Sequence, residues 1–237
     1  MNGEAQIQQP PMPSATAMIR TLAGIAMLSG FLVVLVFQLT KPMIEENQRR
    51  AIEKAVFQVI PGAVRRVDWV VTDSAAVPAG PDAPEGIPVY AAYDADGRLK
   101  GIAARAGAVG YADMIHLLYG YDPECRCIRG VKVLKLAETP GLGDKIITDP
   151  AFVANFEALD ARLSGDGTTL ANPIVTVKHG TKGNPWEIDA ISGATVSSKA
   201  VGKALNRSAR TLLPWLVPRV DEMTPPPPLA VESTDIR

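Results

Sequence analysis

A run of twenty residues without a charged side chain lies between Arg20 and Lys41, and it constrains the architecture more than any other feature. At about 1.5 Å of rise per residue, a helix of this length covers roughly 30 Å, the hydrocarbon thickness of a bilayer. A cleaved signal peptide would have a shorter apolar stretch, followed by small residues at a cleavage site. This run ends in Phe37 to Pro42, which offers no such site. We therefore expect an uncleaved transmembrane helix over residues 17–40, in preference to a signal peptide or a buried core helix.

Composition excludes several other classes of protein. Of 237 residues, 47% are hydrophobic, which is enough for a sizeable core and excludes a disordered chain. The net charge of −1 argues against a nucleic-acid binder, and two cysteines are too few for a disulfide framework. Because only one run could cross a bilayer, a multi-span transporter is excluded as well. The expected organisation is a disordered tail over residues 1–16, the span, one domain over 41–218 and a Pro-rich tail over 219–237.

Beyond the span, short runs with alternating polarity are separated by turn residues. They predict strands over residues 88–93, 99–106, 127–136 and 172–178, and helices over 44–60, 150–163 and 194–213. The first of these helices is expected to form a stalk after a break at Pro42, and the proline-rich stretch 74–88 is expected to form a loop. Hairpins with interspersed helices indicate an α+β fold with one mostly antiparallel sheet.

The charges beside the span do not settle its orientation. Arg20 is the basic side chain before it, whereas Lys41, Arg49, Arg50 and Lys54 follow it, among several glutamates. Counting basic residues alone, the positive-inside rule weakly favours a cytoplasmic domain. The topology must therefore be inferred from other features.

The segment from Asp189 to Ser198, with the sequence DAISGATVSS, is the most informative in the chain. Ser192 is predicted to cap a helix, and the small residues Gly193 and Ala194 leave the Thr195 hydroxyl accessible. A first helical turn has free N–H groups and the positive end of the helix dipole, so a phosphate on Thr195 would be well placed. Taken alone, the four residues Ser-Gly-Ala-Thr could also be an ordinary helix start.

Two further segments favour the functional interpretation. Residues 138–146 read ETPGLGDKI, a turn directly after a strand, and residues 107–111 read GAVGY, leading to Ile115. Together with the Ser-Gly-Ala-Thr element they resemble the G-type subunit of the Rnf-type ion-translocating electron transport complex. The C-type subunit of the Na⁺-translocating NADH:quinone reductase shares its FMN-binding domain. The resemblance covers the chain from the membrane span to about Leu213. The sequence departs from the family pattern after Tyr111, where Ala112 to Met114 stand in place of small, glycine-like residues.

The resemblance implies that the phosphate of FMN is esterified to Thr195 by a flavin transferase. The transferase would recognise Asp189, Ser192, Gly193, Ala194 and Thr195, and the cofactor-binding residues would be Ser192, Gly193, Ala194, Thr139, Gly141, Leu142, Gly143 and Tyr111. It implies a single-pass protein of the bacterial inner membrane with a periplasmic domain and a cytoplasmic N-terminal tail. Its FMN would relay electrons in a pump that couples ferredoxin/NAD electron transfer to ion translocation. The partners would be the other subunits.

Two alternatives stay open: the C-type subunit of the quinone reductase, and a membrane-anchored binding or scaffold module without a flavin. Cys125 and Cys127 lack the C-x-x-C spacing of redox or zinc sites, so two plain thiols are expected, with a local disulfide or a redox pair as alternatives. His116 and His179 have no second ligand at metal spacing, and no metal site is expected.

Overall fold

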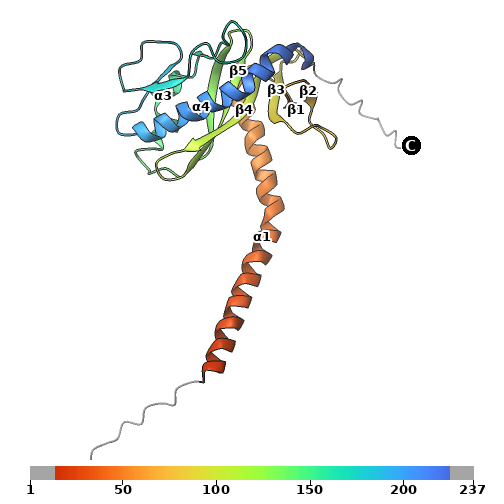
Figure 1. Cartoon of the computed structure of the whole chain (residues 1–237), viewed down its shortest axis with the longest axis vertical. Coiled ribbons are helices and arrows are strands. Elements are labelled where there is room, and N and C mark those ends of the chain that lie inside the picture. Colours follow the sequence, from red (N-terminus) through yellow and green to blue (C-terminus); the bar gives the residue numbers. More distant parts are fainter. Residues whose placement is uncertain (1–13, 225–237) are drawn as a thin grey trace, which may run out of the picture. The chain divides into compact units, whose positions relative to one another are not determined.

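Helix α1 (Ala15–Val59) contains the predicted membrane span, and the computed structural model describes residues 14–224 (Figure 1). The predicted span at residues 17–40 lies inside this helix, with apolar side chains such as Leu28, Phe31 and Phe37 exposed. Within the described residues, α1 is the one helix long and apolar enough to cross a membrane. The chain divides into two compact units between Arg49 and Arg50. The expected tail at residues 1–16 lies outside the described residues, except that helix already begins at Ala15.

The expected helix break at Pro42 is absent, because α1 runs through this residue without interruption. Proline removes one N–H group and with it one i→i−4 hydrogen bond, but the turns on either side keep theirs. The predicted stalk at residues 44–60 is thus the C-terminal part of one helix rather than a separate element.

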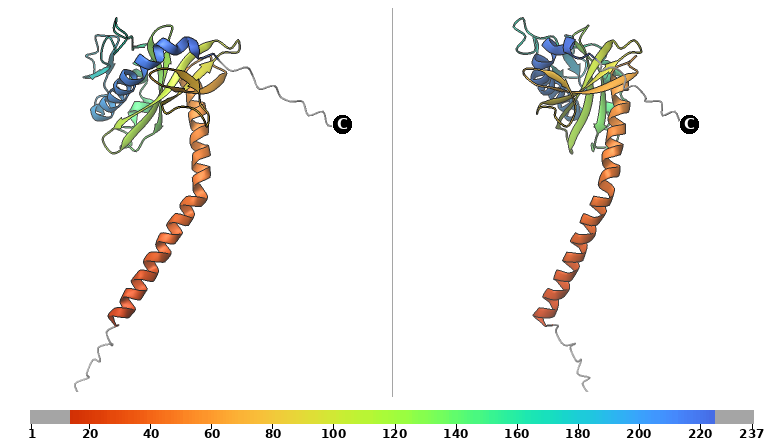
Figure 2. Two further views of the ribbon diagram at one scale, coloured as in Figure 1. Left: turned by 45° about the vertical axis from the view of Figure 1, so that its right-hand side comes forward. Right: turned by 90° about the vertical axis from the view of Figure 1, so that its right-hand side faces the viewer.

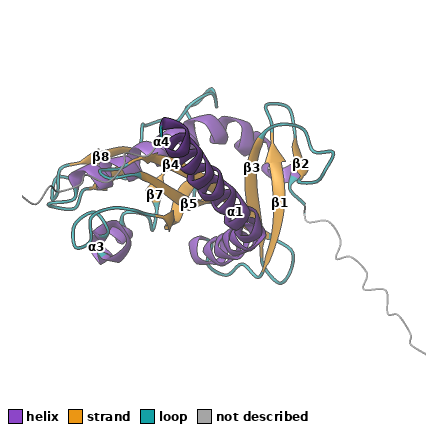
Figure 3. Cartoon of the chain, turned by 90° about the horizontal axis from the view of Figure 1, so that it is seen from below, coloured by secondary structure: helices purple, strands orange, loops and turns teal. Residues whose placement is uncertain are grey.

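Seven antiparallel strands form the main sheet of the second unit (Figure 3), which confirms the expected antiparallel sheet, although the strand predicted over residues 172–178 is not part of it. They are β1 (Arg65–Val71), β2 (Ala76–Pro78), β3 (Ile87–Tyr93), β4 (Leu99–Val109), β5 (Met114–Asp122), β6 (Cys127–Lys135) and β7 (Leu159–Asp160). Their order is β2-β1-β3-β4-β5-β6-β7. The stretch 74–88 is therefore not only a loop, because it contains β2, which pairs with the end of β1.

The remaining elements lie on and beside this sheet. They are α2 (Lys145–Thr148), α3 (Pro150–Ala154), β8 (Val175–Val177), β9 (Glu187–Asp189), α4 (Thr195–Leu216) and the 3₁₀ helix η1 (Val217–Glu222). Strands β8 and β9 form a separate parallel pair. Helix α4 lies along the main sheet (Figure 2).

Both faces of the central strands are covered, which explains their continuous apolar runs. On one face, Val201, Leu205 and Leu212 of α4 belong to the larger core, together with alternate strand residues such as Ala91 and Tyr119. On the other face, the last turns of α1 belong to a smaller core, with Ile52 and Val56 packed among Tyr90, Ala103 and Leu118. Successive side chains of a strand point to opposite faces, so each strand contributes to both cores.

The last turn of α1 contacts the backbone of two strands directly. A Cβ atom placed on Gly130 would lie 2.9 Å from Cα of Val59, and one placed on Gly120 would collide with the Val59 carbonyl oxygen. Glycine is therefore required at both positions for the helix to approach the sheet this closely.

The helix predicted over residues 150–163 is much shorter than expected. Helix α3 ends at Ala154, and Leu159 already belongs to β7. Asn155 explains the ending: its side-chain amide donates a 3.0 Å hydrogen bond to the Phe152 carbonyl oxygen and so competes with the helical backbone.

The chain stays packed beyond residue 218, where the Pro-rich tail was expected to begin. The Tyr93 hydroxyl donates to the Met223 carbonyl oxygen at 2.8 Å, and the Glu222 carboxylate accepts from the Ala76 N–H at 3.2 Å. Met223 is buried. The domain therefore continues to Met223, and the rest of the predicted tail, from residue 225, lies outside the described residues.

Candidate functional site

Three segments that are distant in the sequence meet at the N-terminal end of α4. They are the β4–β5 connection, the turn after β6 and the start of α4, and they enclose a cavity of about 440 Å³. The lining residues are Tyr111, Glu138, Thr139, Leu142, Gly143, Gly193, Ala194, Thr195, Val196 and Ser197. The three motifs that carried the sequence-based prediction thus form one site.

The turn after β6 presents backbone and one apolar side chain to the cavity. The Leu142 and Gly143 N–H groups both donate to the Thr139 carbonyl oxygen, at 3.2 and 3.1 Å. Gly141 has φ +77°, a conformation in which a side chain is unfavourable, and it lies outside the lining. Leu142 is half exposed and offers an apolar surface at the cavity rim.

Helix α4 begins differently from the prediction, because Ser192 does not cap it. Gly193 has φ +82°, and this turn places Ala194 at the N-cap, without a side-chain hydrogen bond to the helix. Ser198 stabilises the turn instead: its hydroxyl donates to the Ala194 carbonyl oxygen at 2.9 Å and accepts from the Ile191 N–H at 3.1 Å. Ser192 is exposed and takes no part in this arrangement.

The helix start fits a phosphate group. Thr195 is the first residue of the 22-residue helix α4, and its side chain is exposed at the cavity. Within the described residues, the N–H groups of Thr195, Val196 and Ser197 have no backbone acceptor. Free N–H groups and the helix dipole both favour an anion at this position. Exposed apolar side chains of Tyr111, Leu142 and Val196 provide contact area for an aromatic ring.

Glu138 connects all three segments, and it was not among the predicted site residues. One carboxylate oxygen accepts from the N–H groups of Tyr111 and Ala112, at 2.9 and 3.1 Å. The other accepts from the Ser197 hydroxyl of α4 at 2.6 Å. The side chain is 8% exposed. A buried carboxylate needs such donors, so Glu138 holds the Tyr111 loop and the helix start together.

These hydrogen bonds decide the charge of Glu138. Burial by itself raises the pKa of the carboxyl, but the bonds from Ser197 and from the loop N–H groups outweigh burial, and the net pKa lies below the usual value. Two glycines make room for the carboxylate: a Cβ on Gly143 would lie 2.6 Å from it, and one on Gly110 would overlap it. Glu138 is therefore an anion at neutral pH.

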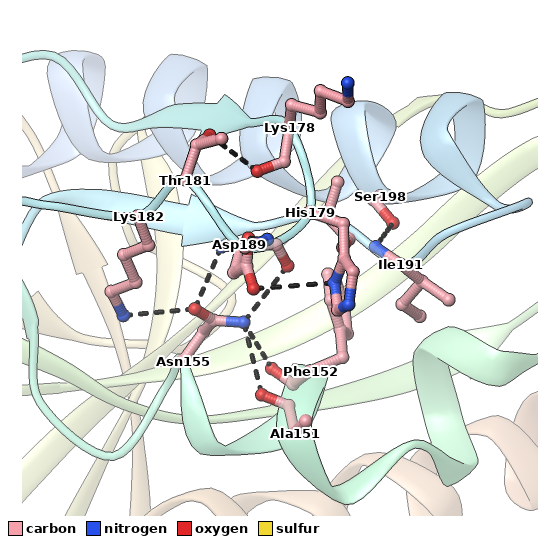
Figure 4. A network of polar contacts seen from close by, with 12 residues as sticks. Ala151, Phe152, Asn155, Lys178, His179, Thr181, Lys182, Asp189, Ile191 and Ser198 are labelled. Carbon is pink, nitrogen blue, oxygen red and sulfur yellow. Dashed lines mark hydrogen bonds and ion pairs between the residues drawn. The ribbon is translucent and has the colours of Figure 1, made fainter.

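A second polar network lies on the other side of the residue 191–195 turn (Figure 4). The Asp189 carboxylate accepts from the Gly180 N–H at 2.7 Å and lies 3.5 Å from the His179 ring. The buried side chain of Asn155 accepts from the Asp189 N–H at 2.9 Å and donates to the Asp189 carbonyl oxygen at 3.3 Å. His179 in turn contacts the Ala190 carbonyl oxygen at 2.9 Å. This network fixes β9 and the chain that leads to Thr195.

Most of the residues predicted to bind the cofactor lie at the cavity, but three predicted site residues do not. Tyr111, Thr139, Leu142, Gly143, Gly193, Ala194 and Thr195 line it. Ser192 and Asp189 line a neighbouring cavity of about 390 Å³ with His179, and Gly141 lines neither. Glu138, Val196 and Ser197 also line the cavity and were not predicted to do so. Glu138 opens the ETPGLG segment, and a lone glutamate after an alternating strand was the one available signal.

Two plain thiols were expected, with a local disulfide as an alternative, and the structure has the alternative: Cys125 and Cys127 form a disulfide. Arg126 between them has φ +55°, which turns the chain so that the two Cα atoms lie 5.2 Å apart, within the usual range for a disulfide. In the described part of the chain, no three His, Cys, Asp or Glu side chains are grouped as metal ligands would be.

Comparisons with known proteins agree with this geometry. A model of the FMN-binding domain matches residues 110–210, and a model of the RnfG N-terminal region matches residues 20–59. The G-type subunit of the ion-translocating oxidoreductase complex of Pseudomonas aeruginosa is 33% identical over 195 residues, which cover 80% of this chain and 85% of the relative. Its counterpart in Methanosarcina acetivorans is 30% identical over 194 residues, covering 81% and 90%.

Solved structures share the fold. The C-type subunit of the Na⁺-translocating NADH-quinone reductase from Parabacteroides distasonis has a TM-score of 0.55 at 21% identity, covering 73% of this chain and 94% of that one. NqrC from Shewanella oneidensis has a TM-score of 0.54 at 20% identity, covering 69% and 93%. An apolar N-terminal helix is thus followed by an FMN-binding domain with this sheet. The chain belongs to the RnfG family, the G-type subunits of ion-translocating oxidoreductase complexes.

Proposed function

We propose that this protein carries FMN as a phosphoester on Thr195 and relays electrons within a membrane-bound, ion-translocating oxidoreductase complex. The observation that carries the proposal is the exposed Thr195 hydroxyl at the first residue of α4, beside three N–H groups that have no backbone acceptor in the described chain. The match of residues 110–210 to the FMN-binding domain supports the cofactor, and the RnfG-family relatives support the complex.

Exposure of the site gives the covalent bond a physical purpose. Thr195, Val196 and Leu142 are all open to solvent, so a flavin resting on them would be accessible to neighbouring redox centres. Such a flavin has little buried contact area, and noncovalent contacts alone would allow it to dissociate. A bond to Thr195 removes that loss without enclosing the cofactor.

The residues of the chain then have separate tasks. The first-turn N–H groups of α4 stabilise the phosphate, and the rim residues Tyr111 and Leu142 contact the ring. Glu138 keeps the Tyr111 loop against α4 and so fixes the width of the cavity. FMN supplies one- and two-electron chemistry, whereas the protein sets position and environment. Coupling to ion movement is a task of the assembled complex.

The Cys125–Cys127 disulfide favours a periplasmic domain. Disulfides persist in oxidising compartments such as the periplasm and are rare in the cytosol. We therefore propose that α1 crosses the inner membrane once, and that a flavin transferase on the same side attaches FMN to Thr195. We favour the ferredoxin/NAD complex over the quinone reductase, because the relatives of 30–33% identity are G-type subunits and the NqrC structures are only 20–21% identical.

Replacing Thr195 with Val tests the proposal. Val keeps the β-branched shape and removes the hydroxyl, so the domain folds but carries no covalent FMN. The control is Thr139→Val, which removes another threonine hydroxyl from the same cavity and retains the adduct. Both full-length variants are produced with the flavin transferase, and the adduct is measured by mass spectrometry under denaturing conditions.

An adduct on Thr195→Val but not on Thr139→Val would move the attachment to Thr139. A parent protein without any adduct, produced with the same transferase, would contradict the flavin-carrier function itself. It would favour the scaffold module.

A further inference from the structure

A second and larger cavity, of about 720 Å³, lies between α4 and the end of β4, and nothing described so far uses it. Its strand side consists of Gly107, Ala108 and Val109, with Met114 next to them. Its helix side carries Lys203, Asn206, Arg207, Arg210 and Thr211. We refer to it as the β4–α4 groove.

The strand side of this groove is a sheet edge without a partner strand. The ladder between β3 and β4 ends at the pair Val89 and Ala104, and the same register places Pro88 opposite Arg105. Proline has no N–H group and cannot continue the ladder. The Ser208 hydroxyl donates to the Arg105 carbonyl oxygen at 3.2 Å in its place. Beyond this point, β4 pairs only with β5 within the described residues.

The free edge offers backbone groups that another strand could use. Alternate residues of a strand direct their N–H and C=O groups to the same edge. Because the Arg105 carbonyl points to Ser208 of α4, the backbone groups of Gly107 and Val109 face that same side, into the groove. Val109, the last residue of the strand, is 70% exposed.

The helix side of the groove is strongly basic. Lys203, Arg207 and Arg210 recur at intervals of four and three residues, which places them on one face of α4. All three are exposed, the groove lining contains no carboxylate, and no ion pair with them is found between residues 14 and 224. Like charges at such spacing repel each other, so a bound anion would stabilise this face.

We propose that the β4–α4 groove binds an extended acidic segment of another subunit, which adds as a strand to β4 and places carboxylates against Lys203, Arg207 and Arg210. The proposal rests on the proposed function and names the chemistry of the partner. Lys203 follows Thr195 by eight residues, or about 12 Å along the helix axis. A polypeptide held there lies close to the flavin, as electron transfer between subunits requires.

The geometry favours a polypeptide over an anionic membrane surface. A lipid surface would need basic side chains on a flat or protruding face, whereas these line a recess beside a strand edge. Strand addition to an exposed edge provides main-chain hydrogen bonds, and its side chains alternate between the two faces. Carboxylates at alternate positions of such a segment would therefore lie on one face and contact Lys203, Arg207 and Arg210.

Charge reversal in the full-length protein tests the groove. Arg207→Glu with Arg210→Glu weakens the binding of the chain to a complex that lacks only this protein by about tenfold, because attraction becomes repulsion. The matched control is Arg98→Glu with Lys100→Glu, which changes the net charge equally at the opposite end of β4 and leaves binding unchanged. The FMN adduct is measured on every variant and is retained in all of them.

Two further measurements identify the occupant in the assembled complex. The Gly107 and Val109 amides exchange hydrogen more slowly in the complex than in the isolated full-length chain, because a partner strand accepts their hydrogen bonds. A photoreactive phenylalanine at Thr211 crosslinks to a segment richer in Asp and Glu than in Lys and Arg. Thr211 lines the groove without contributing charge.

Equal binding of both charge-reversed variants would overturn the proposal, as would crosslinks to lipid or to a segment without an acidic excess. Unchanged amide exchange at Gly107 and Val109 would overturn strand addition. Because the FMN adduct is measured separately, these outcomes leave the flavin attachment at Thr195 intact. An absent adduct on the parent protein would instead contradict the proposed function.

Discussion

Glu138 and Asp189 lie on opposite sides of the residue 191–195 turn, and other groups of the protein donate hydrogen bonds to both carboxylates. Only the Glu138 side exposes Thr195 and the start of α4. On that side, Glu138 accepts three hydrogen bonds and leaves the Thr195 hydroxyl and the helix N–H groups exposed. On the other side, Asp189 accepts from Gly180, and the buried Asn155 binds its backbone. Each carboxylate positions the chain on its own side of the turn. The groups that remain without a partner in the described chain, the Thr195 hydroxyl and the first N–H groups of α4, define the site.

The difference lies in what each carboxylate connects. Asp189 belongs to β9, so its network joins a strand to the ending of α3 and to the residue 178–181 turn. Glu138 joins two loops to the first turn of a helix, with no strand pairing among them. We infer that the Asp189 side supports the stability of the domain and that the Glu138 side controls the shape of the cavity.

The largest expected effect on stability comes from Asn155→Ala, which removes the side-chain hydrogen bonds to the Asp189 backbone. This change leaves the partly buried N–H and C=O groups of Asp189 without these partners, and it lowers the free energy of unfolding by about 2 kcal/mol. Urea unfolding of the domain measures it. Asn184→Ala is the control, because its exposed side-chain amide donates to the Glu187 carboxylate at the surface, and it costs less than about 1 kcal/mol. Equal losses for both variants would contradict the structural role of Asn155.

A smaller effect on stability, but a larger one on the cavity, is expected from Glu138→Gln. Glutamine keeps the shape and can still accept from the Tyr111 and Ala112 N–H groups, but it loses the charge that strengthens these bonds, at a cost of about 1 kcal/mol. The spectrum of the bound flavin should shift while Asn155→Ala, where folded, leaves it unchanged. An unaltered spectrum in Glu138→Gln would show that the carboxylate does not shape the cavity.

Glu138→Gln should also change how the stability of the domain depends on pH. The pKa of Glu138 is lower in the folded protein, so its ionised form stabilises the fold above the unfolded pKa, near 4.5, and this contribution is lost as the pH falls through the folded pKa. The parent protein should lose stability in that acidic range, and Glu138→Gln should lose less. Parallel pH profiles for the two proteins would contradict the assignment.

The smallest effect is expected from Ser192→Ala. Because Ala194 is the N-cap and Ser198 bonds the turn, removing the exposed Ser192 hydroxyl changes the free energy of unfolding by less than about 0.5 kcal/mol. Unfolding of the purified domain measures this. If Ser192 instead served as the cap, the loss would be about 1 kcal/mol.

The sequence was most informative where a residue is placed by its immediate neighbours. The small residues before Thr195 and the turn residues around Gly141 determine local backbone shape, so the main features of both segments were predictable. The antiparallel sheet followed from period-two patterns bounded by turns. The disulfide depended on the unusual backbone of Arg126, which no pattern in the sequence indicates.

Contacts between distant residues were not predictable in the same way. Glu138 meets Ser197 across 59 positions, and Asn155 meets Asp189 across 34, so neither partner is visible in a local pattern. The short α3 and the position of the α4 cap follow from side-chain bonds of shorter range, Asn155 to Phe152 and Ser198 to Ile191, which override helical periodicity. Pro42 shows the converse, since a local signal for a break was overridden by the continuity of the helix.

The contact of Val59 with Gly120 and Gly130 has a mechanical consequence. Where side chains separate a helix from a sheet, a small push can be absorbed by rotamer changes, but here backbone meets backbone. Packed interiors are nearly incompressible and transmit strain. β5 begins next to the Tyr111 loop, and β6 ends three residues before Glu138, so both strands run from this contact to the site. The last turn of α1 and the cavity wall therefore form a stiff linkage, in which displacement at one end is passed on rather than dissipated.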